Sequence, residues 1–123
     1  MNRFGAVMCD LDKFKYINDT FGHDSGDRAL IQFAECVRGS IRKEDVFARI
    51  GGDEFAMIIE CNDLESCRSF VGKLYKKTAS LELEGTSHPI HASFGYAHIN
   101  EGGGPEELMK RADDSLYEAK KRL

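Results

Sequence analysis

Short apolar runs and stretches with helical spacing alternate along this chain. The first run, from Phe4 to Cys9, ends at Asp10-Leu11-Asp12, which indicates a buried strand whose end is polar. Asp24 then offers a possible helix N-cap. Apolar residues follow it at helical spacing, namely Leu30, Phe33, Ala34, Val37 and Ile41. The pattern therefore predicts a strand followed by an amphipathic helix.

The middle of the chain predicts a β-hairpin and a second helix. Residues 46–50 and 55–59 are short strand-like runs, and Gly51-Gly52 between them is a common turn sequence. Asn62 or Asp63 can cap the helix that follows. Its apolar face would be formed by Leu64, Cys67, Val71, Leu74 and Tyr75.

The last third predicts one more strand and one more helix. A turn around Gly85 leads to a strand over residues 90–99, and the glycines at 102–104 then break the chain. Pro105 suits the first turn of the final helix. That helix would bury Leu108, Ala112, Leu116 and Ala119.

The order strand–helix–strand–strand–helix–strand predicts an α+β sandwich with a ferredoxin-like βαββαβ core and an added C-terminal helix. In that fold the first and third strands are central, antiparallel neighbours. The end of the first strand, at Asp10, should therefore lie beside the start of the third, at Asp53 and Glu54. Asp12 is expected to point to the opposite face or into the loop.

Composition narrows the class of protein. The 123 residues predict one domain, 1–123, and 41% hydrophobic with 31% charged residues is usual for a soluble protein. No apolar stretch reaches the ~18–20 residues of a transmembrane helix, and the first residues do not resemble a signal peptide. A net charge of −4 argues against a nucleic-acid partner. The four cysteines lack zinc spacing and are expected to be reduced, buried thiols in a cytoplasmic setting.

The three acids expected at one strand edge predict a metal site. Like charges held close together cost stability unless something neutralises them. Asp10, Asp53 and Glu54 therefore call for a cation, and hard oxygen ligands favour Mg²⁺ or Mn²⁺. The alternative is that they are solvated acids at strand ends, which would suit any one of them alone.

Several motifs resemble one family. Gly51-Gly52-Asp53-Glu54-Phe55 spells the signature of the GGDEF family of diguanylate cyclases. Further matches follow the family order over essentially the whole chain: residues 10–19, Gly22-His23-Asp24 with Gly26-Asp27, Ser93-Phe94-Gly95, and then Ala112-Asp113, Leu116-Tyr117 and Ala119-Lys120. The resemblance implies a fold of the nucleotidyl cyclase or palm type. It also implies condensation of two GTP into cyclic di-GMP and two pyrophosphates.

The resemblance assigns roles to the acids. It implies that Asp10, the backbone carbonyl of Leu11, and Asp53 bind the metal. Glu54 would contribute to the metal site or to deprotonating the attacking 3′-hydroxyl. Which of Asp53 and Glu54 does what stays open, because both share one electrostatic neighbourhood.

The resemblance also assigns the nucleotide contacts. Asn18 and Asp27 would read guanine, since a carboxylate accepts from its N1–H and exocyclic amine. Asp27 would equally favour a helix dipole, and His23 lies either near the nucleotide or packed in the turn.

Phosphate contacts are implied for Lys15 and Lys120, and for backbone amides around Phe14 and Lys15. Lys120 also suits a helix C-terminus, where its charge complements the dipole. Gly51 and Gly52 would let the nucleotide lie against the backbone in addition to forming the turn.

Arg42 and Asp45 stand where the family places its R-x-x-D product-inhibition site. There they would hold cyclic di-GMP, because Arg pairs with phosphate or guanine and Asp pairs with the donor edge of guanine. A surface ion pair would have the same sequence.

Three hypotheses follow. The first is a cyclase acting as a homodimer, in a protein that carries a sensory or dimerising domain as well. The second is a catalytically silent cyclic di-GMP receptor that binds through Arg42 and Asp45. The third is another nucleotide cyclase or a palm-type polymerase.

Family members usually begin earlier, with a helix and a D-x-L-T-G-L-x-N-R-type segment that this chain lacks.

Overall fold

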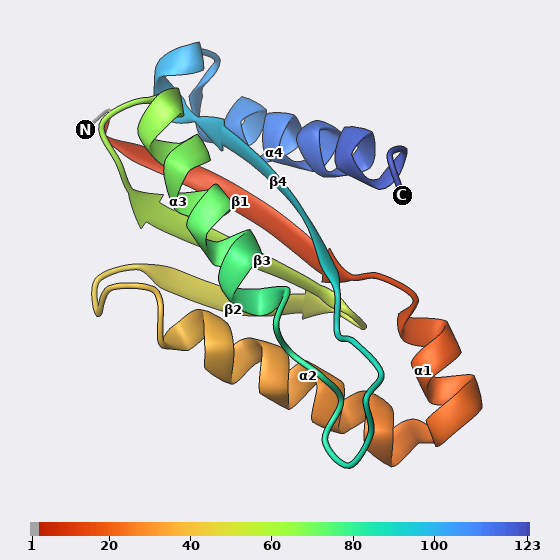
Figure 1. Cartoon of the computed structure of the whole chain (residues 1–123). Helices are drawn as coiled ribbons and strands as arrows, with labels where there is room; N and C mark the ends of the chain where they lie inside the picture. The colour runs from red at the N-terminus through yellow and green to blue at the C-terminus, as the bar shows by residue number, and fades with distance from the viewer. Residues whose placement is uncertain (1–2) are drawn as a thin grey trace.

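The chain folds into a four-stranded antiparallel sheet with helices on both faces (Figure 1). A computed structural model describes residues 3–123. The strands are β1 (Phe4–Leu11), β2 (Val46–Gly51), β3 (Glu54–Glu60) and β4 (Ala92–His98). The helices are α1 (Phe14–Phe21), α2 (His23–Arg38), α3 (Leu64–Thr78) and α4 (Gly104–Lys120), with a 3-10 turn η1 (Ile99–Glu101). Met1 and Asn2, the first residues of the predicted domain, lie outside the described part.

The sheet order β2-β3-β1-β4 confirms the predicted α+β fold with a ferredoxin-like core. Alternation along β1 separates two cores. Val7 and Cys9 face the larger core, which α2 and α3 cover. Ala6 and Met8 face the smaller one, where α4 buries Leu108, Ala112 and Leu116.

The strand register positions the acids as the topology predicted. β1 pairs with β3 so that Asp10 stands opposite Glu54. One residue further on, the Leu11 amide donates to the Asp53 carbonyl at 3.2 Å. The end of β1 and the tip of the β2–β3 hairpin are therefore adjacent.

The start of α3 and the first turn of α4 agree with the sequence prediction, whereas the start of α2 does not. Asp63 caps α3 as predicted, accepting from the Ser66 amide at 2.8 Å, and Pro105 lies in the first turn of α4. The predicted cap at Asp24 is wrong: Gly22 is the N-cap of α2, and Asp24 lies in its first turn. The acid still favours the dipole there, but without capping an amide.

Packing changed other expectations. Leu64 and Tyr75 were predicted to face the core, yet they are 40% and 51% exposed, because α3 contacts the sheet along a narrower stripe. The last strand begins at Ala92 rather than at residue 90, and Ala119 is only half-buried. The four cysteines are free thiols, with Cys9 and Cys67 buried. Within residues 3–123, no helix combines the length and apolarity that crossing a membrane requires.

Candidate functional site

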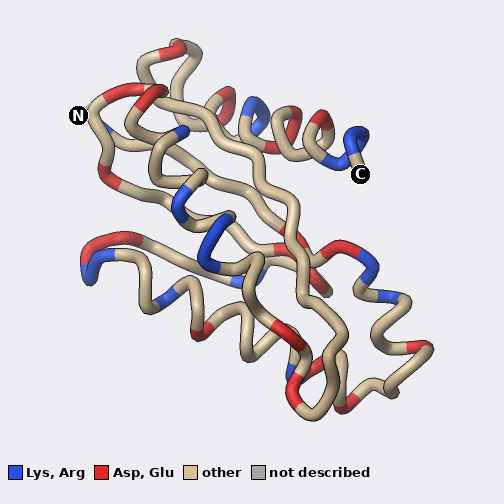
Figure 2. Tube along the Cα trace, in the orientation of Figure 1, with Lys and Arg blue, Asp and Glu red and all other residues tan. Residues whose placement is uncertain are grey.

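The acids of the candidate site lie on the face of the sheet that α4 covers. Asp10 continues the β1 alternation that places Ala6 and Met8 on this face, and Glu54 lies directly opposite it on β3. In Figure 2 acidic positions gather at the end of β1 and at the tip of the β2–β3 hairpin. The two strand ends thus present their carboxylates to one region.

Lys120 at the end of α4 reaches into this region. Its ammonium donates to Asp10 Oδ1 at 2.6 Å and to Asp12 Oδ1 at 3.3 Å. The structure therefore places Lys120 beside the predicted metal ligands, more than a hundred residues away in sequence. A role limited to its own helix dipole does not account for these two bonds.

The expectation for Asp12 is wrong. Its carboxylate was expected on the opposite face or in the loop, but it shares Lys120 with Asp10 and accepts from Ser93 Oγ at 2.8 Å. Residues two apart along an extended chain point to the same side, and this relation continues past the end of β1.

The electrostatics show an excess of negative charge. Burial raises the pKa of Asp10, and Asp53 and Asp12 raise it further against the opposing effect of Lys120. The pKa of Glu54 is also raised, by burial and then by Asp113, Asp10 and Asp53. One ammonium does not offset this many carboxylates, so the donor set suits a divalent cation.

The donors are not gathered into a finished coordination shell. Among residues 3–123, no three His, Cys, Asp or Glu side chains stand close enough together to hold a metal ion as they are. Asp10 is occupied by Lys120, and repulsion opposes closer approach of the other carboxylates. Oxygen chemistry and charge nevertheless fit Mg²⁺ or Mn²⁺ at Asp10, Leu11, Asp53 and Glu54.

Asp113 is a further acid near the site, and the sequence patterns did not indicate a role for it. It lies on α4 and raises the pKa of Glu54 through its charge. The available signal was its spacing from Lys120, because residues seven apart lie on one helix face.

The predicted guanine readers come from neighbouring helices. Asn18 is half-buried on α1, and Asp27 is exposed in the first turns of α2. Asn18 packs against Gly26, the residue before Asp27: a Cβ at Gly26 would collide with the Asn18 side-chain oxygen. His23 is exposed at the start of α2, so the alternative of a histidine packed in the turn does not hold.

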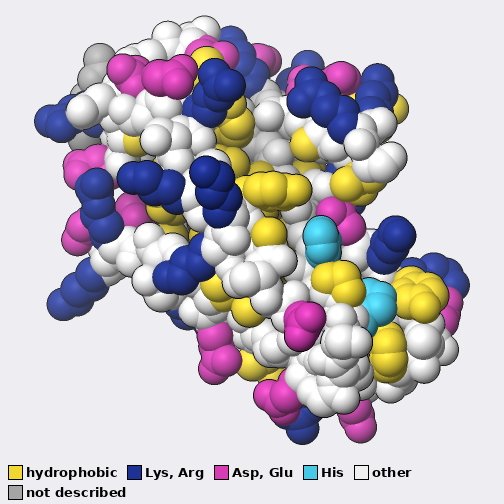
Figure 3. All heavy atoms as spheres, in the orientation of Figure 1, with side chains coloured by type: hydrophobic (Ala, Val, Ile, Leu, Met, Phe, Trp, Pro, Cys, Tyr) yellow, Lys and Arg dark blue, Asp and Glu magenta, His cyan; other side chains and the backbone are white. Residues whose placement is uncertain are grey.

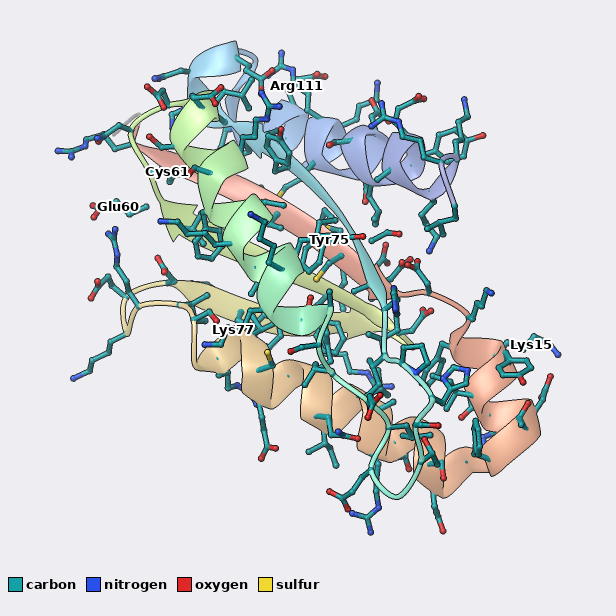
Figure 4. All side chains as sticks on the ribbon, viewed as in Figure 1. Lys15, Glu60, Cys61, Tyr75, Lys77 and Arg111 are labelled. Carbon is teal, nitrogen blue, oxygen red and sulfur yellow. The ribbon has the colours of Figure 1, made fainter. Side chains whose placement is uncertain are left out.

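The start of α1 leaves backbone amides available near Phe14 and Lys15. Lys13 precedes the helix in the left-handed conformation, with φ 58°, and no side chain caps the helix. The Lys15 ammonium does not join the acids. It pairs with Asp19 at 2.8 Å, is 89% exposed, and points away from the sheet (Figure 4).

The two signature glycines are not required by the local structure. Gly51 ends β2 and Gly52 begins the turn, but neither has a positive φ. A Cβ at Gly52 would meet nothing within 4 Å, and one at Gly51 would make only ordinary contact with Glu54. The geometry of the hairpin therefore does not explain why both positions are glycine.

Arg42 and Asp45 lie at the other end of β3. Asp45 accepts from the Arg42 amide at 2.8 Å and from the Glu60 amide at 3.3 Å, which fixes the turn before β2. The Arg42 guanidinium pairs with Glu60 at 3.3 Å. A hollow of about 300 Å³ adjoins the pair, between the turn and α3. Basic side chains gather over α3 in the face shown in Figure 3, and Glu60 and Cys61 are labelled beside this hollow in Figure 4.

Comparison with known proteins identifies the family. A sequence model described as "Diguanylate cyclase, GGDEF domain" matches residues 1–123. The bifunctional diguanylate cyclase/cyclic di-GMP phosphodiesterase MucR of Pseudomonas aeruginosa is 38% identical over 120 residues, covering 96% of this chain and 18% of MucR. The fold and the strand-edge acids define a nucleotidyl-cyclase-type domain. The chain belongs to the GGDEF family of diguanylate cyclases.

Solved structures agree with this assignment. The GGDEF domain of YfiN (TpbB) from Pseudomonas aeruginosa superposes with a TM-score of 0.91 at 29% identity, covering 99% of this chain and 78% of that one. The GGDEF domain of DgcB from Caulobacter crescentus, solved with c-di-GMP, gives 0.86 at 29% identity, covering 98% and 73%.

Proposed function

We propose that this domain condenses two molecules of GTP into cyclic di-GMP and two pyrophosphates. The observation that carries the proposal is the register of β1 with β3, which brings Asp10 and the Asp53-Glu54 signature to one edge. The family relationship supports it, because the relatives include named diguanylate cyclases. The chain spans 18% of the length of MucR and 28% of that of the diguanylate cyclase DgcM of Escherichia coli.

Each residue of the site then has a task. A divalent ion, Mg²⁺ or Mn²⁺, supplies charge neutralisation at phosphate oxygens when bound, and Asp10, the Leu11 carbonyl, Asp53 and Glu54 would hold it. Glu54 also suits proton removal from the 3′-hydroxyl, because its pKa is raised.

Binding of the nucleotide is assigned to the elements around the acids. Asn18 and Asp27 hold guanine between α1 and α2, with His23 beside them. The amides of Phe14 and Lys15, and the ammonium groups of Lys15 and Lys120, meet phosphate oxygens. Gly51 and Gly52 leave open space over the hairpin, where a ligand can lie against the backbone.

Partners and regulation are proposed on the same basis. Cyclic di-GMP binds Arg42 and Asp45 as an inhibitor, and the exposed guanidinium of Arg42 supports this. Turnover requires a homodimer, because the two-fold symmetric product closes between two facing half-sites. We further propose a cytoplasmic setting and a sensory or dimerising domain in the full-length protein.

Incubation of the chain with GTP and Mg²⁺, followed by chromatography, tests the function. Pyrophosphate and cyclic di-GMP are expected from the wild type, and neither from a folded Asp53→Ala variant. Arg42→Ala should keep turnover and lose product inhibition. Cyclic di-GMP binding without turnover would replace the proposal with the receptor hypothesis. Turnover by Asp53→Ala would contradict the metal assignment.

A further inference from the structure

Asp12 is held in place by both its side chain and its backbone. Its side chain is 8% exposed and accepts from Ser93 Oγ at 2.8 Å, and Ser93 is itself buried. Its amide donates to the His91 carbonyl at 2.8 Å. The carboxylate is therefore anchored on the β4 side of the sheet.

Asp10 and Asp12 differ in what else they face. Asp10 stands opposite Glu54, toward the hairpin that carries the signature acids. Asp12 is bonded on the β4 side, away from that hairpin. The Lys120 ammonium bridges the two, closer to Asp10 at 2.6 Å than to Asp12 at 3.3 Å.

A divalent ion and the ammonium compete for Asp10. Both are cations, and their mutual repulsion opposes their sharing one carboxylate at close range. Metal binding therefore displaces Lys120 from Asp10, and the nearest anchored acceptor is Asp12.

We propose that Asp12, anchored by Ser93, is a positioning residue that retains Lys120 when a divalent ion takes Asp10. In the metal-free chain the ammonium serves as the neutralising cation of Asp10. After exchange it stays within reach of the site on Asp12, where it can meet a phosphate group. Only this last step rests on the proposed function; the exchange itself concerns the chain and the metal alone.

Calorimetric titration of the GTP-free protein with Mn²⁺ tests the exchange. Lys120→Met should tighten Mn²⁺ binding about tenfold, because the competing cation is gone. Lys121→Met is the matched control: Lys121 is the next residue and pairs with Glu118 at 3.4 Å, so binding should stay within about twofold of wild type.

The role of Asp12 is read from a double-mutant cycle. Asp12→Asn should weaken Mn²⁺ binding at least about threefold more in the wild-type background than in the Lys120→Met background. Only the wild-type background contains a lysine that must be displaced from Asp10 and held by Asp12. Asp113→Asn removes an equal charge near Glu54 and should weaken binding equally in both backgrounds. If Asp12→Asn folds poorly, Ser93→Ala can replace it, and it should reproduce part of the same effect by removing the hydrogen bond that anchors Asp12.

Equal effects of Asp12→Asn in the two backgrounds would reduce Asp12 to a distant charge and overturn the inference. So would unchanged Mn²⁺ affinity in Lys120→Met. A chain that binds Mn²⁺ with the predicted coupling but makes no cyclic di-GMP would contradict the proposed function alone.

Discussion

Gly26 shows how one missing side chain can position a binding residue. The Asn18 amide group occupies the space where a Cβ of residue 26 would stand. Gly26→Ala should therefore push Asn18 out of place and weaken GTP binding about three- to tenfold, the equivalent of one hydrogen bond. Equilibrium binding of GTP, measured in the presence of Ca²⁺ for the wild type and the variant, gives the change in affinity. Thermal unfolding of the same two proteins shows whether misfolding contributes to that change.

The change should cost little stability, because the group displaced is the end of a flexible side chain and alanine favours a helix more than glycine does. Asn18→Ala in the Gly26→Ala background should cause no further loss of affinity. Two independent, additive losses would show that Gly26 does not act through Asn18.

Glu54 couples stability to pH. Its pKa is raised in the folded chain, first by burial and then by neighbouring acids, so the folded state binds its proton more tightly than the unfolded state. This contribution to stability is present at low pH and is lost as pH rises through the raised pKa. Glu54→Gln should therefore stabilise the metal-free chain at pH 7, by less than about 1 kcal/mol because Glu54 is only partly buried and solvent screens the repulsion.

Chemical denaturation of both proteins at pH 7 and pH 4 checks this prediction. The advantage of Glu54→Gln should shrink at pH 4, where the wild-type carboxyl group approaches its protonated form. An advantage that is constant with pH, or a less stable variant at pH 7, would exclude charge repulsion at this site.

At the scale of elements, the order of apolar and polar residues along the sequence was sufficient to predict the strands and their arrangement in the sheet. The strand order and the meeting of Asp10 with Glu54 were predicted, because they follow from the order of elements alone. Helix α1 was not predicted, since it is short and begins without a capping side chain. The bonds from Lys120 to Asp10 and Asp12 could not be predicted from local patterns, because the angle of α4 across the sheet sets them.

That angle depends on Gly95. A Cβ on this β4 residue would collide with the backbone of Leu116 and Ala112, so α4 crosses β4 at a distance only glycine permits. Gly95→Ala should destabilise the chain by about 1–3 kcal/mol or more, because backbone cannot move aside as a side chain can. It should also separate Lys120 from the acids.

Gly72→Ala is the matched control. Gly72 lies exposed within α3, and a Cβ there would meet nothing within 4 Å. That variant should gain about 0.5–1 kcal/mol from helix propensity. Unfolding in urea measures both, and a Gly95→Ala variant as stable as wild type would refute close packing as the reason for this glycine.

At the scale of the molecule, the proposed function predicts an assembly. If the chain makes cyclic di-GMP, which joins two GTP-derived halves, two chains are expected to face each other during turnover. The rate per chain should therefore fall on dilution once the dimer dissociates. Initial rates over a range of protein concentrations, alongside sedimentation, check this, and a constant rate per chain from a monomer would contradict it.

The proposed function depends on a divalent ion held jointly by the end of β1 and the β2–β3 hairpin. Anomalous diffraction from crystals of the chain grown with Mn²⁺ and a non-hydrolysable GTP analogue measures this directly. The predicted result is a manganese peak bounded by Asp10, the Leu11 carbonyl and the Asp53-Glu54 pair, with Lys120 no longer bonded to Asp10. Bound nucleotide with no peak there, or with manganese held elsewhere on the chain, would contradict a metal site at these two strand ends.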